Sequence, residues 1–263
     1  NPAYAACYDY LGIAMFKKGK VDEAIVQYKY ASQSDPNLTG AYYHLGNALL
    51  QKGEPDEAMA QFQKTLEIDP NYADARVNLA NILLKNGQVD EAIVQYQEAL
   101  QASPHLAGAY VDLGDALLQK GQPDQAVTQY QKALEIDPNY APACYNIGNI
   151  FVQKGKLNEA ADKFREALKI NSGLAEAHFS LGDVLVQKGQ MDEALAEFQK
   201  AAQINPNYVE AHNNAGWVLL QEGQAEKAIF QFQETLRLNP NYTNARDNLA
   251  KAEAMMRQRT EQK

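Results

Sequence analysis

A fixed spacing of 34 residues runs through this sequence, and an internal repeat restricts the fold more than any local feature does. We call residues that share one position in successive repeats a column. One column contains Pro2, Pro36, Pro70, Pro104, Pro138, Pro206 and Pro240, with Ser172 in the remaining repeat. A first glycine column contains Gly19, Gly53, Gly87, Gly121, Gly155, Gly189 and Gly223. A second contains Gly12, Gly46, Gly114, Gly148, Gly182 and Gly216, with Ala80 and Ala250 as substitutes. The chain is therefore predicted to be a repeat array.

Each period has the pattern of two helices, as residues 39–72 illustrate. Tyr42, Leu45 and Leu49 fall on one face of a first helix, and Gly53 supplies the left-handed backbone that ends it. A second helix begins at the next proline, a residue favoured in the first turn, and ends before the Asp-Pro step. One helix pair cannot cover its own apolar face, so neighbouring pairs must stack. The sequence predicts an all-α fold, an α-solenoid of antiparallel helix pairs.

The columns also set the expected domain boundaries. Seven repeats are predicted at 5–38, 39–72, 73–106, 107–140, 141–174, 175–208 and 209–242. Residues 1–4 match the end of a repeat, because Asn1 and Pro2 lie six periods before Asn205 and Pro206. We expect residues 1–4 to be the tail of a missing upstream repeat. Residues 243–263 are expected to form a C-terminal capping helix, since Arg257 replaces the terminating glycine.

Two further columns indicate where the helices pack. Small residues recur at Ala24, Ala58, Ala92, Ala126, Ala160, Ala194 and Ala228. Aromatic residues recur at Tyr28, Phe62, Tyr96, Tyr130, Phe164, Phe198 and Phe232. Small side chains let two helices cross closely, and large rings fill the space that remains. These columns are therefore predicted to form the core.

Leu45, Gly46, Ala58, Phe62 and Pro70, with equivalents in the other repeats, resemble the tetratricopeptide repeat (TPR). The resemblance covers essentially the whole chain, although Tyr, Arg, Cys or His stands at the family's early tryptophan. It implies a right-handed TPR superhelix whose concave side is lined by the first helix of each repeat. It also implies that positions two, five, six, nine, twelve and thirteen of each repeat face that side.

Charge and composition restrict the partners. A net charge of -9 makes the chain poorly suited to neutralise phosphates, so we expect no nucleic-acid partner. The apolar runs are far shorter than the roughly 20 residues needed to cross a bilayer, so no membrane insertion is expected. No targeting signal is visible, and the cytoplasm is the favoured location. Cys7 and Cys144 lie four repeats apart, spaced like neither a zinc site nor a disulfide framework, and are expected to be small core residues.

Catalytic signatures are missing from the sequence. It contains no phosphate-binding loop, nucleophile elbow, zinc-protease or calcium-loop pattern. His178 and His212 are one period apart, so their helices should lie about 10 Å apart, too far for a shared metal. They are expected to fill the early aromatic position. We expect no enzyme, no catalytic residue, no metal and no cofactor.

Positions six and nine of successive first helices carry mostly amides and carboxylates. We call this set the polar ladder: His44, Asn47, Asn78, Asn81, Asp112, Asp115, Asn146, Asn149, Ser180 and Asp183. The two residues of each repeat are i, i+3 and so share one helix face. Amides suit an extended peptide, because each offers a donor and an acceptor to a backbone that carries both. The pattern is similar to the asparagine-lined superhelices of O-linked N-acetylglucosamine transferases. The alternative is that these residues only solvate an exposed face.

The expected partner is a protein or peptide with neutral or basic segments, because acids such as Asp112, Glu176 and Asp183 line the predicted face. Some TPR adaptors bind the C-terminal carboxylate of a partner through Lys and Arg residues. This sequence lacks those residues at the corresponding positions. Four aromatic residues are candidate apolar anchors, with a core role as the alternative: Tyr43, Tyr145, Phe179 and Trp217.

Three functions stay open at this point. The first is an interaction scaffold that binds an extended peptide in its concave groove, and the second is a substrate-recruiting arm of a larger enzyme such as a glycosyltransferase. The third is a module that self-assembles through its ends. Self-association through the truncated N-terminal end is expected, since Tyr4, Tyr8 and Met15 should be partly unshielded.

A triple change of ladder amides tests the first function. Replacing Asn47, Asn81 and Asn149 by Ala is expected to abolish partner capture. The melting temperature should barely change, because solvent-facing substitutions usually alter stability by less than about 0.5 kcal/mol.

Overall fold

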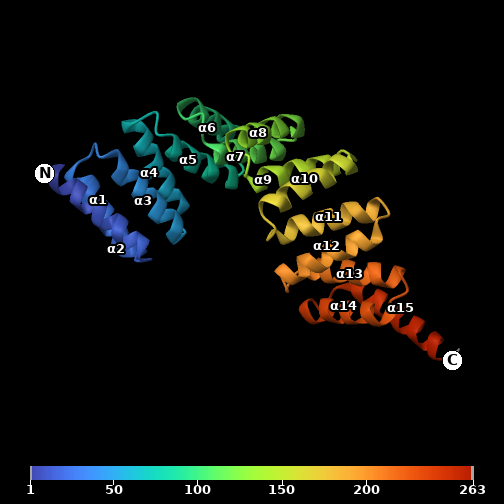
Figure 1. The fold of residues 1–263 in the computed structure, drawn as a ribbon. Helices are drawn as coiled ribbons and strands as arrows, with labels where there is room; N and C mark the ends of the chain where they lie inside the picture. The colour runs from blue at the N-terminus through green and yellow to red at the C-terminus, as the bar shows by residue number, and fades with distance from the viewer. Residues whose placement is uncertain (1, 262–263) are drawn as a thin grey trace. The chain divides into compact units, whose positions relative to one another are not determined.

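The structure is a computed structural model that describes residues 2–261, with side chains described for residues 4–258. These residues form 15 helices and no strand (Figure 1). The chain divides into two compact units, Asn1–Ile136 and Asp137–Lys263. The N-terminal unit holds α1 (Pro2–Lys17), α2 (Val21–Ser34), α3 (Thr39–Lys52), α4 (Pro55–Ile68), α5 (Ala73–Lys85), α6 (Val89–Ala102), α7 (Ala107–Gln119) and α8 (Pro123–Ile136). The C-terminal unit holds α9 (Ala141–Gln153), α10 (Leu157–Ile170), α11 (Ala175–Gln187), α12 (Met191–Ile204), α13 (Val209–Gln221), α14 (Ala225–Leu238) and α15 (Thr243–Glu261).

A left-handed glycine ends the first helix of each repeat, as predicted. In α3, the amides of Gly53 and Glu54 donate to the carbonyl oxygens of Leu50 and Leu49 at 3.1 and 2.9 Å, and Gly53 has a φ of 87°. Positive φ recurs at Gly19, Gly53, Gly87, Gly121, Gly155, Gly189 and Gly223. This conformation costs other residues far more than glycine. Each unit is an α-solenoid of antiparallel helix pairs.

A side-chain turn connects one helix pair to the next. The Oδ1 atom of Asp69 accepts a hydrogen bond from the backbone amide of Asn71 at 3.0 Å, a turn that Asp and Asn form readily. Equivalent turns form at Asp35, Asp137, Asn171, Asn205 and Asn239. At Asn171 the donor is Gly173, so the turn persists where the junction lacks proline.

The aromatic column lies at the centre of the core in both units. Phe62 is fully buried in a cluster that includes Leu79 and Ile82 of the following repeat. The ring also packs against the first helix of its own repeat, where a Cβ added at Gly46 would lie 2.6 Å from the ring atom Cε1. An alanine at this position therefore requires the ring to shift, and the third repeat carries Ala80 there, so glycine in the second glycine column gives the ring the most room. The prediction that the small and aromatic columns form the core is confirmed.

Helices form both ends of the described chain. Residues 2–4 lie in the first turn of α1, and their assignment to the tail of a preceding repeat stays a prediction. Ala3, a strong helix former, stands where most other junctions have the asparagine that donates to the turn. Residue 1 lies outside the described residues. At the other end, α15 is a single helix with Ala245 and Ala252 buried.

The expectation that both cysteines are core residues is wrong for one of them. Cys144 is buried in α9, whereas Cys7 is exposed on α1. Helix α1 packs against α2 and α3, both of which follow it in the chain. No described helix precedes α1 to cover its remaining side.

Candidate functional site

The ladder residues lie on the first helices of successive repeats, which are neighbours within each unit (Figure 1). We call the surface that these helices share the first-helix face. The N-terminal unit contributes six ladder residues from α3, α5 and α7: His44, Asn47, Asn78, Asn81, Asp112 and Asp115. The C-terminal unit contributes four from α9 and α11: Asn146, Asn149, Ser180 and Asp183. All are half-buried except Asp115, which is exposed.

Hydrogen bonds connect ladder positions of consecutive repeats. The Nδ2 atom of Asn78 donates to Oδ1 of Asn47 at 2.8 Å, so position six of one repeat meets position nine of the preceding repeat. The same bond forms in the C-terminal unit, where Nδ2 of Asn214 donates to Oδ1 of Asp183 at 2.9 Å. These bonds hold the ladder side chains in defined orientations. His44 is also held, since its Nδ1 lies 2.9 Å from Oδ1 of Asp9.

Two ladder residues bind buried tyrosines of the aromatic column. The hydroxyl of Tyr96 donates to Oδ1 of Asn81 at 2.5 Å, and the hydroxyl of Tyr130 donates to Oδ1 of Asp115 at 2.5 Å. Both tyrosines are fully buried. The structure therefore predicts that an alanine at position 81 lowers stability, in contrast to the expectation from the sequence, because the substitution removes the partner of a buried hydroxyl.

Acidic ladder residues are partly desolvated. Burial, together with the neighbouring carboxylate of Asp115, raises the pKa of Asp112 to about 6. Burial also raises the pKa of Asp183 to about 6, although the hydrogen bond from Asn214 opposes this shift. A nearby positive charge stabilises such carboxylates in their ionised form.

The four candidate anchors are half-buried and contact the core. Tyr43 packs against Tyr72 with ring centroids 4.9 Å apart, and Phe179 packs against Tyr208 at 5.0 Å. The ring centroids of Tyr145 and Phe164 are 5.7 Å apart. These contacts occupy much of each ring in packing between helices. Trp217 differs, because it also lines a pocket.

This pocket, of about 440 Å³, lies between α11, α13 and α15 of the C-terminal unit. Its lining residues are Asp183, Val186, Phe198, Asn213, Asn214, Trp217, Asn244, Asp247, Asn248 and Lys251. The sequence analysis did not predict most of these lining residues, because the polar ladder was defined only as far as Asp183. The same register would have found Asn214 and Asn248, which occupy position six of the seventh repeat and of the capping helix.

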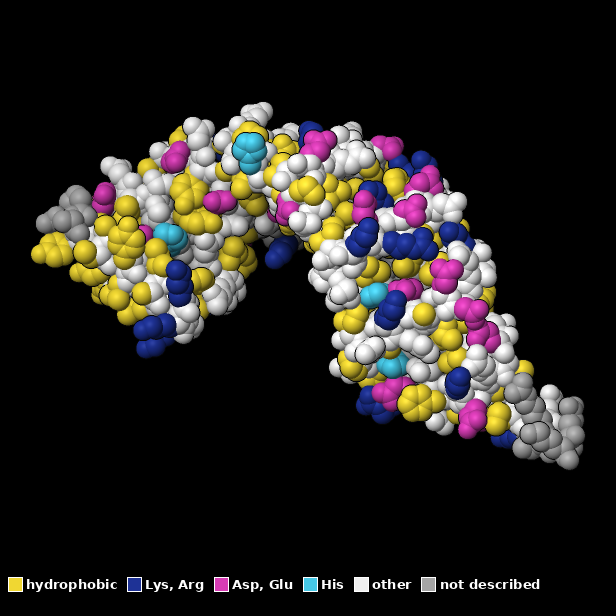
Figure 2. Space-filling model, in the orientation of Figure 1, with side chains coloured by type: hydrophobic (Ala, Val, Ile, Leu, Met, Phe, Trp, Pro, Cys, Tyr) yellow, Lys and Arg dark blue, Asp and Glu magenta, His cyan; other side chains and the backbone are white. Residues whose placement is uncertain are grey.

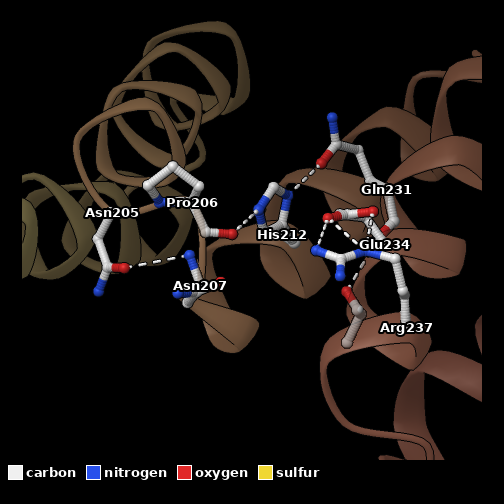
Figure 3. A network of polar contacts seen from close by, with 8 residues as sticks. Asn205, Pro206, Asn207, His212, Gln231, Glu234 and Arg237 are labelled. Carbon is white, nitrogen blue, oxygen red and sulfur yellow. Dashed lines mark hydrogen bonds and ion pairs between the residues drawn. The ribbon is translucent and has the colours of Figure 1, made fainter.

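A separate hydrogen-bond network holds the junction between repeats (Figure 3). The ring nitrogens of His212 lie 2.8 Å from Oε1 of Gln231 and 3.1 Å from the carbonyl oxygen of Pro206. His178 is placed similarly, with Nδ1 2.5 Å from Glu197 and Nε2 3.2 Å from the carbonyl oxygen of Ser172. Both histidines thus connect an inter-repeat turn to the second helix of their own repeat. Within the described part of the chain, no three His, Cys, Asp or Glu side chains gather as metal ligands would.

Family profiles described as "TPR repeat" match residues 12–53, 80–121, 114–152, 148–189 and 182–223, and profiles described as "Tetratricopeptide repeat" match 49–97 and 209–242. The chain belongs to the tetratricopeptide-repeat family. A comparison with curated proteins gave no match. None of the described helices is long and apolar enough to cross a membrane.

Solved structures with the same architecture include MamA, which is 29% identical to this chain with a TM-score of 0.58. The match covers 63% of this chain and 96% of MamA. YrrB, described as a TPR protein with an unusual peptide-binding site, is 26% identical with a TM-score of 0.57, over 70% of this chain and 95% of YrrB. PilF of Pseudomonas aeruginosa is 22% identical with a TM-score of 0.72, over 81% and 97% of the two chains, and shows a shared fold.

Proposed function

We propose that this protein is a non-catalytic interaction scaffold that binds extended peptide segments along its first-helix faces. The observation that carries the proposal is the hydrogen-bonded pair of Asn47 and Asn78. Their bond uses one donor and one acceptor, so the pair still offers the remaining Asn47 donor and Asn78 acceptor to a peptide backbone. Because the bond orients both amides before a partner arrives, less side-chain entropy is lost on binding.

Two further features support this proposal. The partly desolvated carboxylates of Asp112 and Asp183 suit segments with basic side chains. YrrB, similar to this chain over most of YrrB's length, is described as binding peptide. An extended peptide advances about 3.3 Å per residue, so helices about 10 Å apart would meet it at every third residue.

Replacing both members of the amide pair tests the proposal. We expect Asn47→Ala with Asn78→Ala to weaken binding of a basic twelve-residue peptide by about 10- to 30-fold, since two hydrogen bonds contribute about 1 kcal/mol each. The peptide is selected against the parent protein from a random library, and its affinity is measured by calorimetry. The double variant removes both amides together, so neither is left without its partner, and the unfolding midpoint should stay nearly constant.

The matched control is Asn158→Ala, because Asn158 is an exposed amide on the second helix α10. It should bind the selected peptide as the parent does. Unchanged affinity in the double variant would place the binding surface on the second helices or at an end of the array.

A second candidate function, self-association, is favoured by the apolar surface at the beginning of the N-terminal unit. Large side chains are exposed on α1 and α2, where Figure 2 shows hydrophobic groups gathered: Tyr4, Tyr10, Leu11, Val26 and Tyr30. Tyr10 is 72% exposed and Tyr30 is 49% exposed. Tyr8 and Met15 are half-buried, in agreement with the expectation that they are partly unshielded: Met15 packs against the core, and the ring of Tyr8 lies at a tilted angle to that of Tyr30. Clustered apolar surface of this kind commonly marks a protein interface.

We expect the parent protein to associate at high concentration and Tyr10→Lys with Val26→Lys to remain monomeric. A lysine pair in this surface would bury two unpaired charges on association, which is strongly unfavourable. Sedimentation velocity over a concentration series measures the difference, with Phe230→Lys as the control on the exposed side of α14. A parent that stays monomeric throughout the series contradicts this second function.

A further inference from the structure

The pocket between α11, α13 and α15 contains a buried polar atom that the fold does not use. Asn213 is 7% exposed, and its Nδ2 donates to Oδ1 of Asn214 at 3.0 Å. Its own Oδ1 is buried and has no hydrogen-bond partner among the described residues. An acceptor left unpaired in this way costs free energy, and native structures rarely tolerate it without a reason.

The repeat pattern shows that the fold itself does not require a polar residue at this position. Asn213 is the fifth residue of its repeat, and the preceding repeats carry Tyr43, Val77, Val111, Tyr145 and Phe179 there. In the first repeat the position holds Asp9, whose carboxylate is paired with His44 at 2.9 Å. Asn213 therefore replaces an apolar residue with an amide whose acceptor is unsatisfied, next to a pocket.

The surrounding groups define what the pocket would accept. Asn213 donates to Asn214, and Asn214 donates to Asp183 at 2.9 Å, so both amides spend a donor within the chain of bonds. The lining residues still have several acceptors outside this chain of bonds: Oδ1 of Asn213, the second oxygen of Asp183, and the carboxylate of Asp247. Among the described residues that line the pocket, the one cation is Lys251 of α15, whose Nζ lies 3.3 Å from Oδ1 of Asn248.

We propose that this pocket binds the guanidinium group of an arginine side chain in a partner peptide. Guanidinium presents several donors in one plane, which matches two acceptors and a carboxylate better than the single point charge of lysine. Trp217 in the pocket wall supplies aromatic surface, with which guanidinium interacts favourably. At about 440 Å³ the pocket also falls in the range of ordinary ligand sites. The inference rests on the proposed function, since the pocket is one point on the first-helix face of the C-terminal unit.

Trp217 is the sole tryptophan of the sequence and lines this pocket, so its fluorescence is sensitive to binding there. The probes are three capped pentapeptides, Gly-Gly-X-Gly-Gly, with arginine, lysine or citrulline as X. Each is too short to span several ladder positions, which separates this test from that of the amide pair. We expect the arginine peptide to bind the full chain at least about tenfold more tightly than the lysine or citrulline peptide, by fluorescence and by calorimetry.

Two variants and one control complete the experiment. Asp183→Asn removes the carboxylate, and Asn213→Val installs the residue that two other repeats carry at this position. Each should weaken binding of the arginine peptide at least about tenfold while the helical circular dichroism stays unchanged. Asp192→Asn, an exposed acid on α12, should bind as the parent does. Equal binding of the arginine and citrulline peptides, parental affinity in both variants, or no binding of any probe would overturn the inference.

Discussion

Replacing Phe164 by Ala should cost about 3–5 kcal/mol of the free energy of unfolding, because it removes a fully buried ring from a close-packed core. The ring contacts Tyr145 and the backbone of α9 at Gly148, where a Cβ would already lie 2.6 Å from it. The backbone of α9 is rigid, so the core cannot collapse fully into the cavity that the missing ring leaves. The cavity term is therefore expected to persist and to place the loss near the upper end of the range.

Urea denaturation followed by Trp217 fluorescence measures this loss where it occurs, since Phe164 and Trp217 belong to the same core cluster. Stability in repeat arrays is transmitted mainly between neighbouring repeats, so the C-terminal unit should respond most strongly. Phe230→Ala is the matched control: Phe230 is 64% exposed on α14, and its removal should change stability by less than about 0.5 kcal/mol. Equal losses in the two variants would show that burial in the aromatic column does not determine stability.

Asn81→Ala should cost about 1–3 kcal/mol, although Asn81 lies on a half-buried helix face that the sequence suggested was free to change. The loss arises in the hydroxyl of Tyr96, which is buried and donates to Oδ1 of Asn81. Alanine leaves this hydroxyl without an acceptor and without water. The change in urea midpoint, followed by circular dichroism, gives the magnitude.

The double variant Asn81→Ala with Tyr96→Phe separates this cause from a general loss of packing. It should recover most of the lost stability, because Phe62, Phe164, Phe198 and Phe232 fill the same column without a hydroxyl. Asn149→Ala is the control, because the aromatic-column residue of its repeat is Phe164, which has no hydroxyl that needs a partner. If Asn149→Ala is as destabilising as Asn81→Ala, the tyrosine hydroxyl is not the source of the effect.

The helices, their ends and the core columns could be predicted from the sequence because each depends on local rules that the 34-residue period repeats. A glycine in the left-handed conformation ends a helix wherever it stands, and Gly53 does so through hydrogen bonds to Leu49 and Leu50 a few residues away. The small and aromatic columns recur at one spacing, so their burial could be predicted, whereas the contact of Gly46 with Phe62 appears only in the structure.

The tertiary structure determines which polar side chains on the first-helix faces are hydrogen-bonded, and to which partners. The sequence placed Asn47, Asn78 and Asn81 on these faces, but it gave no sign that the first two bind each other or that the third binds a tyrosine. Those partners are 15 to 31 residues apart, and a side-chain hydrogen bond forms only when helix packing brings two atoms within about 3 Å. The unpaired acceptor of Asn213 follows the same rule, because whether a buried amide finds a partner depends on every helix that surrounds it.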